Sequence, residues 1–393
     1  MNPMNQPDDF VLLGPVRRLR AAGVLAQLPP ALATGPAAAG HALTLLRDTE
    51  SRTGRRSVVV GAVPFDTTRA ARLFVPARVE WDGTRPANGG PARRPAGWTG
   101  PDDPEYRSAV AAALRGIDAG MVDKVVLART VDLRLTQELD PAVVVTELAG
   151  TNRNGYTFRV DIGEGQVLVG ASPELLAAVE GDRLVSHPLA GTAARSADPV
   201  ADRAAAQDLL ASPKNTDEHR VLVDALGAAL GAVAASVQTP SAPELVATER
   251  LWHLGTRITG RLRPGLSVLD VAYALHPTPA VCGTPTRTAA DLIRLLEPVD
   301  RGFYAGLVGW MDSAGQGEWV LALRCARLTG RDVRLYAGAG VVAGSDPAGE
   351  HAETAAKLQT VLDALGELAD LPGHDRVADP VADRLAGELV EVR

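Results

Sequence analysis

Three lysines stand out in this 393-residue chain, because nearly all of its 40 basic side chains are arginine. They are Lys124, Lys214 and Lys357. Arginine keeps its charge in proteins, whereas lysine can lose its proton when burial or a nearby cation lowers its pKa. Lysines that persist in such a chain are candidates for proton transfer. The alternative interpretation is that they are chance remnants on the surface.

Two short stretches place carboxylates near the start of predicted helices. PKNTDEHR contains Glu218, and SDPAGEHAETAAK contains Glu350 and Glu353 on one helix face, with Lys357 one turn further. Carboxylates from two helices, without cysteine or histidine partners, are typical of a site for a hard cation such as Mg²⁺. The alternative is that both helices simply present charged faces to solvent.

A glycine pair and a single arginine indicate an anion site. In LYAGAGVV, Gly338 and Gly340 allow the backbone to approach a ligand closely, although a bulged strand end would also explain them. Arg324 lies in the apolar stretch LALRCARL, where it needs either a ligand carboxylate or a structural salt bridge as its partner. Together these groups suggest a small, multiply anionic ligand that binds with Mg²⁺.

Strands and helices are interleaved around these residues at hairpin-like spacing. The pattern favours an α+β fold with antiparallel sheet over repeated βαβ units. The predicted strands are 57–65, 72–81, 124–135, 156–162, 166–180, 183–189, 257–262, 306–312, 318–330 and 332–342, and the predicted helices are 105–120, about 198–236 and 349–368.

We expect one catalytic region, residues 105–368, within a single domain. Residues 1–104 form the N-terminal part of the same fold and end in a polar loop, 82–104, that is expected to be mobile. Residues 369–393 are acidic, poor in aromatic side chains and expected to form a loosely held tail.

Charge and composition exclude several classes of protein. The net charge of −7 argues against a nucleic-acid partner. We find no apolar run long enough to span a membrane and no signal peptide at the start, so the cytoplasm is the expected location. Cys282 and Cys325 form neither a disulfide framework nor a metal-ligand pattern and are predicted to be core residues.

Several segments resemble the chorismate-binding enzyme family, and most closely its isochorismate-forming members. They follow the family's order from about 123 to 357, roughly two thirds of the chain, whereas the first 100 residues match poorly. The segments are DKVVLARTV, GASPELL, HPLAGT, DEHRVLVD, WHLGTRITGRL, LHPTPAVCGTP, DRGFYAGLVGW, GEWVLALRCARL and LYAGAGVVAGSDPAGEHAETAAK. The resemblance implies two large, mostly antiparallel sheets packed together and flanked by helices, with chorismate and Mg²⁺ bound in a deep cleft. It also implies a monomer.

The resemblance assigns roles by motif position. Lys124 would be the general base that activates water, and Glu174 the general acid that protonates the departing hydroxyl. Glu218 and Glu353 would hold Mg²⁺, with Glu350 nearby in the metal shell. The implied substrate-binding residues are Gly191, Thr192, His253, Ala280, Tyr304, Arg324, Gly338, Gly340 and Lys357.

The implied reaction is the Mg²⁺-dependent conversion of chorismate to isochorismate, for siderophore, salicylate or menaquinone biosynthesis. Ala190 stands where relatives that form a covalent adduct carry lysine, and Ala280 where salicylate-forming and amine-adding relatives usually carry threonine. A salicylate synthase, an amine-adding enzyme and a non-catalytic chorismate-binding relative remain alternatives. Without the resemblance, a Mg²⁺-dependent hydrolase of a phosphorylated ligand would compete.

Two positions depart from the family pattern. Asn215 stands where many relatives carry an acidic residue near the metal, and its effect on metal binding is left open. The arginine that often directly follows Gly-Thr is absent, and Arg195 is the nearest candidate to replace it.

Overall fold

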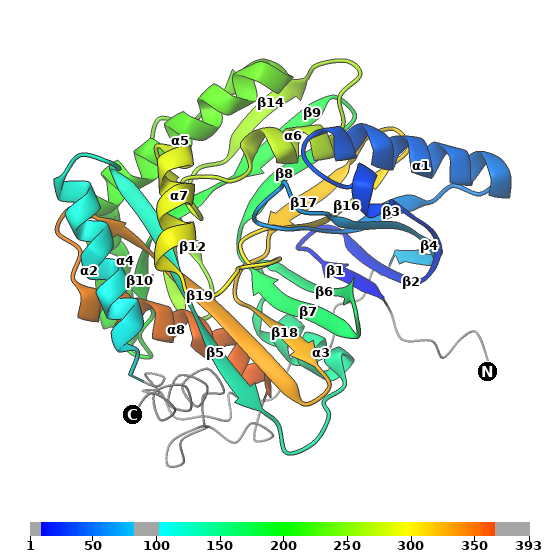
Figure 1. Ribbon diagram of the computed structural model, residues 1–393. Helices are drawn as coiled ribbons and strands as arrows, with labels where there is room; N and C mark the ends of the chain where they lie inside the picture. The colour runs from blue at the N-terminus through cyan, green and yellow to red at the C-terminus, as the bar shows by residue number, and fades with distance from the viewer. Residues whose placement is uncertain (1–8, 82–101, 366–393) are drawn as a thin grey trace, which may run out of the picture.

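The computed structural model describes residues 9–81 and 102–365, which Figure 1 colours from blue to red along the chain. Most of the loop at 82–104 and the whole tail at 369–393 lie outside the described residues, so both stay predictions. No helix within the described ranges is both long and apolar enough to cross a membrane.

A single antiparallel ladder forms the framework of the fold. It joins 16 strands in the order β11-β14-β9-β8-β17-β16-β3-β4-β2-β1-β6-β7-β18-β19-β5-β15, and a separate 3-stranded sheet has the order β10-β13-β12. The strands are β1 (Phe10–Leu13), β2 (Arg18–Gln27), β3 (Val58–Val63), β4 (Arg72–Trp81), β5 (Lys124–Arg134), β6 (Tyr156–Gly163), β7 (Gln166–Ser172), β8 (Leu175–Glu180), β9 (Arg183–His187), β10 (Leu189–Ala194), β11 (Ala234–Gln238), β12 (Glu244–Ala247), β13 (Leu251–Gly255), β14 (Ile258–Leu262), β15 (Gly283–Thr284), β16 (Leu307–Asp312), β17 (Gly317–Leu321), β18 (Cys325–Thr329) and β19 (Asp332–Val342).

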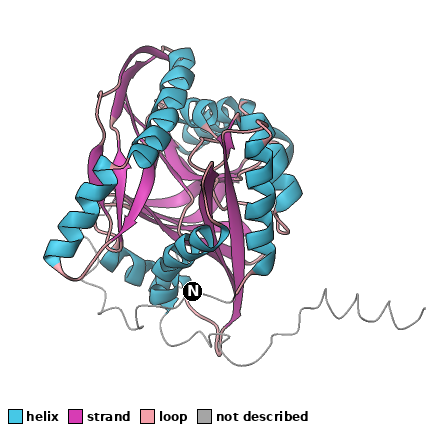
Figure 2. Cartoon of the chain, turned by 90° about the vertical axis from the view of Figure 1, so that its left-hand side faces the viewer, coloured by secondary structure: helices cyan, strands magenta, loops and turns pink. Residues whose placement is uncertain are grey.

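Helices cover the outside of the strands, as Figure 2 shows. They are α1 (Ala37–Thr53), α2 (Pro104–Asp118), α3 (Pro141–Thr151), α4 (Pro199–Ala211), α5 (Pro213–Val233), α6 (Val268–Leu275), α7 (Thr286–Leu296) and α8 (Pro347–Leu365).

The expected α+β fold with antiparallel sheet is confirmed, and the core explains how its two layers arise. Phe158 and Leu168, from β6 and β7, belong to the same buried cluster as Val60 and Trp319, from β3 and β17. The ladder therefore curls back on itself around one core. The two packed sheets that the resemblance implied are two halves of one ladder.

Two predicted strands are wrong in their continuity. The stretch 166–180 is interrupted at Pro173 and Glu174, between β7 and β8, because proline cannot donate a ladder hydrogen bond. The stretch 318–330 is interrupted between β17 and β18, where Arg324 has a φ of 45°. Each interruption takes a candidate site residue out of the ladder.

The predicted helix over 198–236 is also wrong, because it is two helices and the start of a strand. Ser212 ends α4 and caps α5 by accepting a hydrogen bond from the Asn215 N–H, and Pro213 occupies the first turn of α5. Proline suits a first turn, where no backbone donor is needed, but it breaks a helix interior. The new helix carries Lys214, Asn215 and Glu218 in its first two turns.

The longest strand pair carries much of one wall of the candidate site. In the antiparallel register of β5 and β19, Lys124 lies opposite Val342 and Gly338 opposite Ala128. Side chains alternate between the two faces of a strand. The outer face of this pair packs against α8, where Leu358 joins the same buried cluster as Leu335. The inner face is left for the site.

Candidate active site

One cavity contains every residue that the sequence singles out as catalytic, substrate-binding or metal-ligating. Its volume is about 140 Å³, close to the about 150 Å³ that accommodates a benzene ring in a protein interior. The structure therefore brings these residues together around one cavity, while their roles in catalysis, substrate binding and metal binding stay predictions. The lining residues to which the resemblance gave no catalytic, binding or metal-ligating role are Val126, Pro173, Leu189, Ala190, Lys214, Asn215, Val281, Ala305, Leu323, Tyr336 and Ala337.

Lys124 enters the cavity from the first residue of β5. It is 5% exposed, and its Nζ lies 2.7 Å from Oε1 of Glu218 on α5. A Cβ atom added at Gly340 would lie 2.9 Å from Cε of Lys124. The glycine on β19 thus leaves the space that the lysine side chain occupies.

Glu174 projects into the cavity from the break between β7 and β8. It is 3% exposed, and its Oε1 accepts a hydrogen bond of 3.4 Å from the backbone N–H of Leu189. Burial raises its pKa to about 8, against the opposing effect of that hydrogen bond and of the charge of Arg324. A carboxyl group that keeps its proton at neutral pH can act as a general acid.

Arg324 is half-buried in the cavity wall and forms no ion pair in the described part of the chain. Desolvation lowers its pKa to about 10, and its Nη2 donates a hydrogen bond of 3.0 Å to Nε2 of His253. A half-buried guanidinium without a counter-ion is a strong site for an anion.

The contacts of His253 fix its protonation state. Nδ1 lies 3.2 Å from the carbonyl oxygen of Gly191, which can only accept, and Nε2 faces the guanidinium of Arg324, which can only donate. The ring must therefore be neutral with its proton on Nδ1. Burial and the charge of Arg324 hold the pKa of His253 well below its usual value. The ring connects the arginine to the turn at Gly191 and Thr192, whose Oγ1 also lies 3.2 Å from Nδ1.

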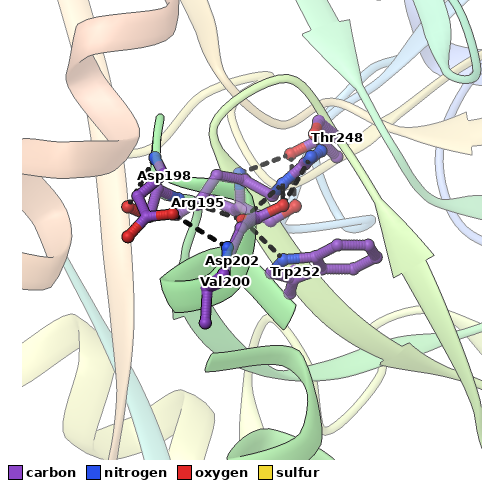
Figure 3. Close-up of polar contacts among 8 residues, drawn as sticks. Arg195, Asp198, Val200, Asp202, Thr248 and Trp252 are labelled. Carbon is purple, nitrogen blue, oxygen red and sulfur yellow. Dashed lines mark hydrogen bonds and ion pairs between the residues drawn. The ribbon is translucent and has the colours of Figure 1, made fainter. Parts of the chain in front are cut away.

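The small sheet that carries this turn is fastened by a polar cluster, drawn in Figure 3. Arg195 donates from Nε and Nη2 to Asp202 on α4, and its guanidinium lies 4.5 Å from the ring centroid of Trp252. Asp202 also accepts a hydrogen bond of 3.0 Å from the Trp252 indole. Arg195 does not line the cavity, so it does not take the place of the arginine missing after Thr192.

Besides Glu174, three glutamates line the cavity, and lysines contact two of them. Glu218 pairs with Lys124, and Glu353 lies 2.6 Å from Nζ of Lys357. Lys357 also donates to the carbonyl oxygen of Gly338, which ties α8 to β19. Burial, with a contribution from the charge of Glu353, raises the pKa of Glu350.

The donor chemistry of this wall suits a hard cation, although its present geometry is not that of a formed metal centre. Within residues 9–81 and 102–365, no group of three or more acidic, histidine or cysteine side chains is arranged to hold a metal ion. Carboxylate oxygens are nonetheless the ligands that Mg²⁺ prefers, and a cation would relieve the repulsion between Glu350 and Glu353. The residues present therefore fit Mg²⁺.

Aromatic rings and small side chains shape the rest of the cavity. Tyr304 stacks on Tyr336 at 5.2 Å between ring centroids, and its hydroxyl lies 2.9 Å from where a Cβ of Gly338 would stand. Ala190 and Ala280 present only methyl groups to the cavity. Neither position can supply a nucleophile.

Two of the lining residues that were not predicted as site residues could have been identified from the sequence. Tyr336 precedes Gly338 and Gly340 by the two-residue period of a strand, so it had to share their face. Lys214 was one of the three lysines that composition singled out. The hydrophobic members, such as Val281 and Leu323, carry no signal that distinguishes them from core residues.

Comparison with known proteins points to the same family as the sequence motifs do. The family model described as "Chorismate binding enzyme" matches residues 90–366. Isochorismate synthase DhbC of Bacillus subtilis is 42% identical over 375 residues, 92% of this chain and 94% of that protein. Isochorismate synthase EntC of Escherichia coli K12 is 37% identical over 92% of this chain and 95% of that protein.

Solved structures agree. The putative 2,3-dihydroxybenzoate-specific isochorismate synthase DhbC from Bacillus anthracis superposes with a TM-score of 0.85 at 37% identity, covering 92% of this chain and 98% of that one. Anthranilate synthase component I from Streptococcus pneumoniae gives a TM-score of 0.64 at 26% identity, over 77% and 80% of the two chains. The shared fold, the matched length and the identity establish that this chain belongs to the chorismate-binding enzyme family.

Proposed function

We propose that this protein is an isochorismate synthase, which converts chorismate to isochorismate with Mg²⁺. The observation that carries the proposal is the joint lining of one cavity by a lysine, Lys124, and a buried carboxylic acid, Glu174, whose pKa is about 8. The half-buried Arg324, which forms no ion pair within the described residues, supports an anionic ligand between them. The curated relatives at 37–42% identity bear the same activity in their names.

The proposed reaction balances with these two groups. As the general base, Lys124 takes a proton from a water molecule while the water oxygen bonds to C2 of the ring. The ring double bonds shift, the C4–O bond breaks, and Glu174 protonates the leaving hydroxyl, which departs as water. Base and acid each exchange one proton, and the product has the mass of the substrate. Each group is typically worth about 10²–10⁴ in rate.

Mg²⁺ would be held by Glu218 and Glu353, with Glu350 nearby. When bound, it would fix a substrate carboxylate and offset its charge. Arg324 and Tyr304 would hold the other carboxylate, and His253 would orient Arg324. Lys357 contacts both Glu353 and the carbonyl oxygen of Gly338, so it would hold α8 in position against β19.

Ala190 favours this reaction over the route through a covalent enzyme adduct. A side chain that forms an enzyme adduct is absent there, so an external molecule must attack C2. Water then yields isochorismate, and ammonia would yield an amino product. We further propose that the chain acts as a monomer in the cytoplasm on a free small molecule, without nucleic acid or membrane. Its product would supply siderophore, salicylate or menaquinone synthesis.

The decisive experiment is product identification. Purified protein is incubated with chorismate, with Mg²⁺ or with EDTA, and with or without ammonium, and products are separated by chromatography and weighed by mass spectrometry. We expect a product of unchanged mass that appears only with Mg²⁺ and that isochorismatase cleaves. Salicylate with pyruvate, or an ammonium-dependent product, would instead establish a sister reaction. Unconsumed chorismate would refute catalysis on this substrate.

A further inference from the structure

Lys214 is the one lysine of the chain to which the proposed reaction gives no task. It lies in the first turn of α5, its side chain is exposed, and it lines the cavity. Lys124 and Lys357 each contact a glutamate, at 2.7 Å and 2.6 Å. Within the described residues, Lys214 has no hydrogen bond and no ion pair. Its exposed side chain thus lines the cavity without a paired carboxylate, although its charge acts on Glu218 and Glu350.

The cavity therefore has two cations without a carboxylate partner among the described residues. Arg324 is the half-buried one, and its hydrogen bond goes to the neutral ring of His253. Lys214 is the exposed one. The proposed substrate carries two carboxylates. Arg324 is placed for one of them, and Lys214 lies on the side of the cavity where Glu218 and Glu350 stand, so it can contact the carboxylate that Mg²⁺ would also fix.

The position of Lys214 supports this contact. A Cβ atom at Gly191 would lie 3.2 Å from Cβ and Oδ1 of Asn215, so the first turn of α5 packs against the Gly191–Thr192 turn. Burial raises the pKa of Glu218, but Lys124, Lys357 and Lys214 together outweigh it and leave that pKa lowered. The charge of Lys214 thus reaches the carboxylate wall, where the second substrate carboxylate would arrive.

We propose that Lys214 captures the outer carboxylate of the dianionic substrate at the cavity mouth and holds it in the bound complex, while Arg324 holds the inner one. The inference rests on the proposed function. It gives Lys214 a role in binding and in rate of encounter, not in proton transfer. A cation at the mouth of a cleft raises the association rate of an anion, and salt screens this effect.

The test compares Lys214→Gln and Lys214→Arg with the wild type in the full-length protein, with Mg²⁺ and chorismate. Arg220→Gln is the matched control. Arg220 lies on the same helix, is exposed and pairs with Asp217 and Asp224, and it does not line the cavity. The Arg220→Gln substitution removes one positive charge from α5, as Lys214→Gln does.

For Lys214→Gln we expect KM to rise about tenfold, the effect of roughly 1.4 kcal/mol, with kcat within about twofold of the wild type. The decline of kcat/KM between about 50 and 300 mM salt should become shallower, because one steering charge is gone. Lys214→Arg should restore the salt dependence, and Arg220→Gln should change neither constant. Because the Lys214 side chain is exposed and unpaired, the variants should fold as the wild type does, and equal melting temperatures check this.

Two results would overturn the inference. An unchanged KM in Lys214→Gln would show that the ammonium does not hold substrate, and an equal loss in kcat would assign it to the chemical step. Both results require a wild type that consumes chorismate. If the wild type does not, the proposed function itself fails and this inference fails with it, so the two failures are distinguishable.

Discussion

At the scale of single residues, burial decides what each titratable group can do. Glu174 and Glu180 belong to the same segment of chain, yet Glu174 is 3% exposed, while the Glu180 side chain is 74% exposed and pairs with Arg17. Removal from water raises the pKa of Glu174 to about 8 and makes it an acid suited to neutral pH.

Glu174→Gln should lower kcat by about 10²–10⁴, because glutamine cannot give a proton to the leaving hydroxyl. Lys124→Ala should have an effect of the same order for the base. The assay is isochorismate formation at saturating chorismate. Glu180→Gln is the matched control and should leave kcat unchanged. Activity within tenfold of the wild type in either active-site variant would contradict the role given to that residue.

His253→Gln tests whether the histidine only positions its neighbours. The glutamine amide oxygen can accept the hydrogen bond that Arg324 now gives to Nε2. We expect KM to rise about fivefold, the value of one lost neutral hydrogen bond to Gly191, while the pH profile of kcat/KM keeps its shape from pH 5 to 9. A limb of the profile that disappears in the variant would show that His253 exchanges protons during turnover.

At the scale of elements, breaks in regular structure position the site. Glu174 lies between β7 and β8, and Arg324 lies between β17 and β18. Lys124, by contrast, stands at the first residue of a strand whose partner is glycine-rich. The close approach of β19 to that lysine depends on the missing Cβ of Gly340.

Gly340→Ala should therefore displace Lys124 without touching its chemistry. The new methyl carbon would lie 2.9 Å from Cε and 3.4 Å from Nζ of the lysine. Misplacement of a catalytic group by about 1 Å can cost about 10²-fold in rate, and we expect a loss of kcat of this order. Gly231→Ala on α5 is the control, because no heavy atom lies within 4 Å of its added Cβ. Unchanged kcat in Gly340→Ala would mean that the Lys124 side chain can move away from the new methyl group without any loss of rate.

At the scale of the whole molecule, the site lowers the stability of the fold as the pH rises. The pKa of Glu174 is near 4.5 in an unfolded chain and about 8 in the folded one. Between these values the folded chain keeps a proton that the unfolded chain has released. The free energy of unfolding therefore falls through this window and levels off above pH 8.

Glu174→Gln should stabilise the protein in that window, because glutamine is neutral in both states. The melting temperature of the variant should exceed that of the wild type by several degrees at pH 8 and by little at pH 5. Thermal denaturation followed by circular dichroism across this pH range is the measurement. A difference that does not grow with pH would show that Glu174 is not held protonated by burial.

The periodicity of apolar residues predicted much of the secondary structure, but it did not predict where helices and strands are interrupted. The helix at 105–120 and the strand at 332–342 are present nearly as expected, because each has a clear period. The single helix expected over 198–236 was wrong, because Pro213 begins a second helix. The sequence pattern alone did not show that this proline marks a helix start. Further strands and helices, including β1, α1 and α3, were not predicted.

The sequence by itself determined the chemical groups available to the candidate site and, through the resemblance, predicted which of them would lie in one cleft. Residue types and motif order are local properties that can be read in a single chain. Only the tertiary structure decided which groups are free and which are engaged. In the tertiary structure Glu174 is buried and Arg195 is paired with Asp202. Arg324 and Lys214 have no paired carboxylate within the described residues. The physical reason is that solvent exposure and ion pairing depend on segments far apart in the chain, such as Lys124 and Glu218.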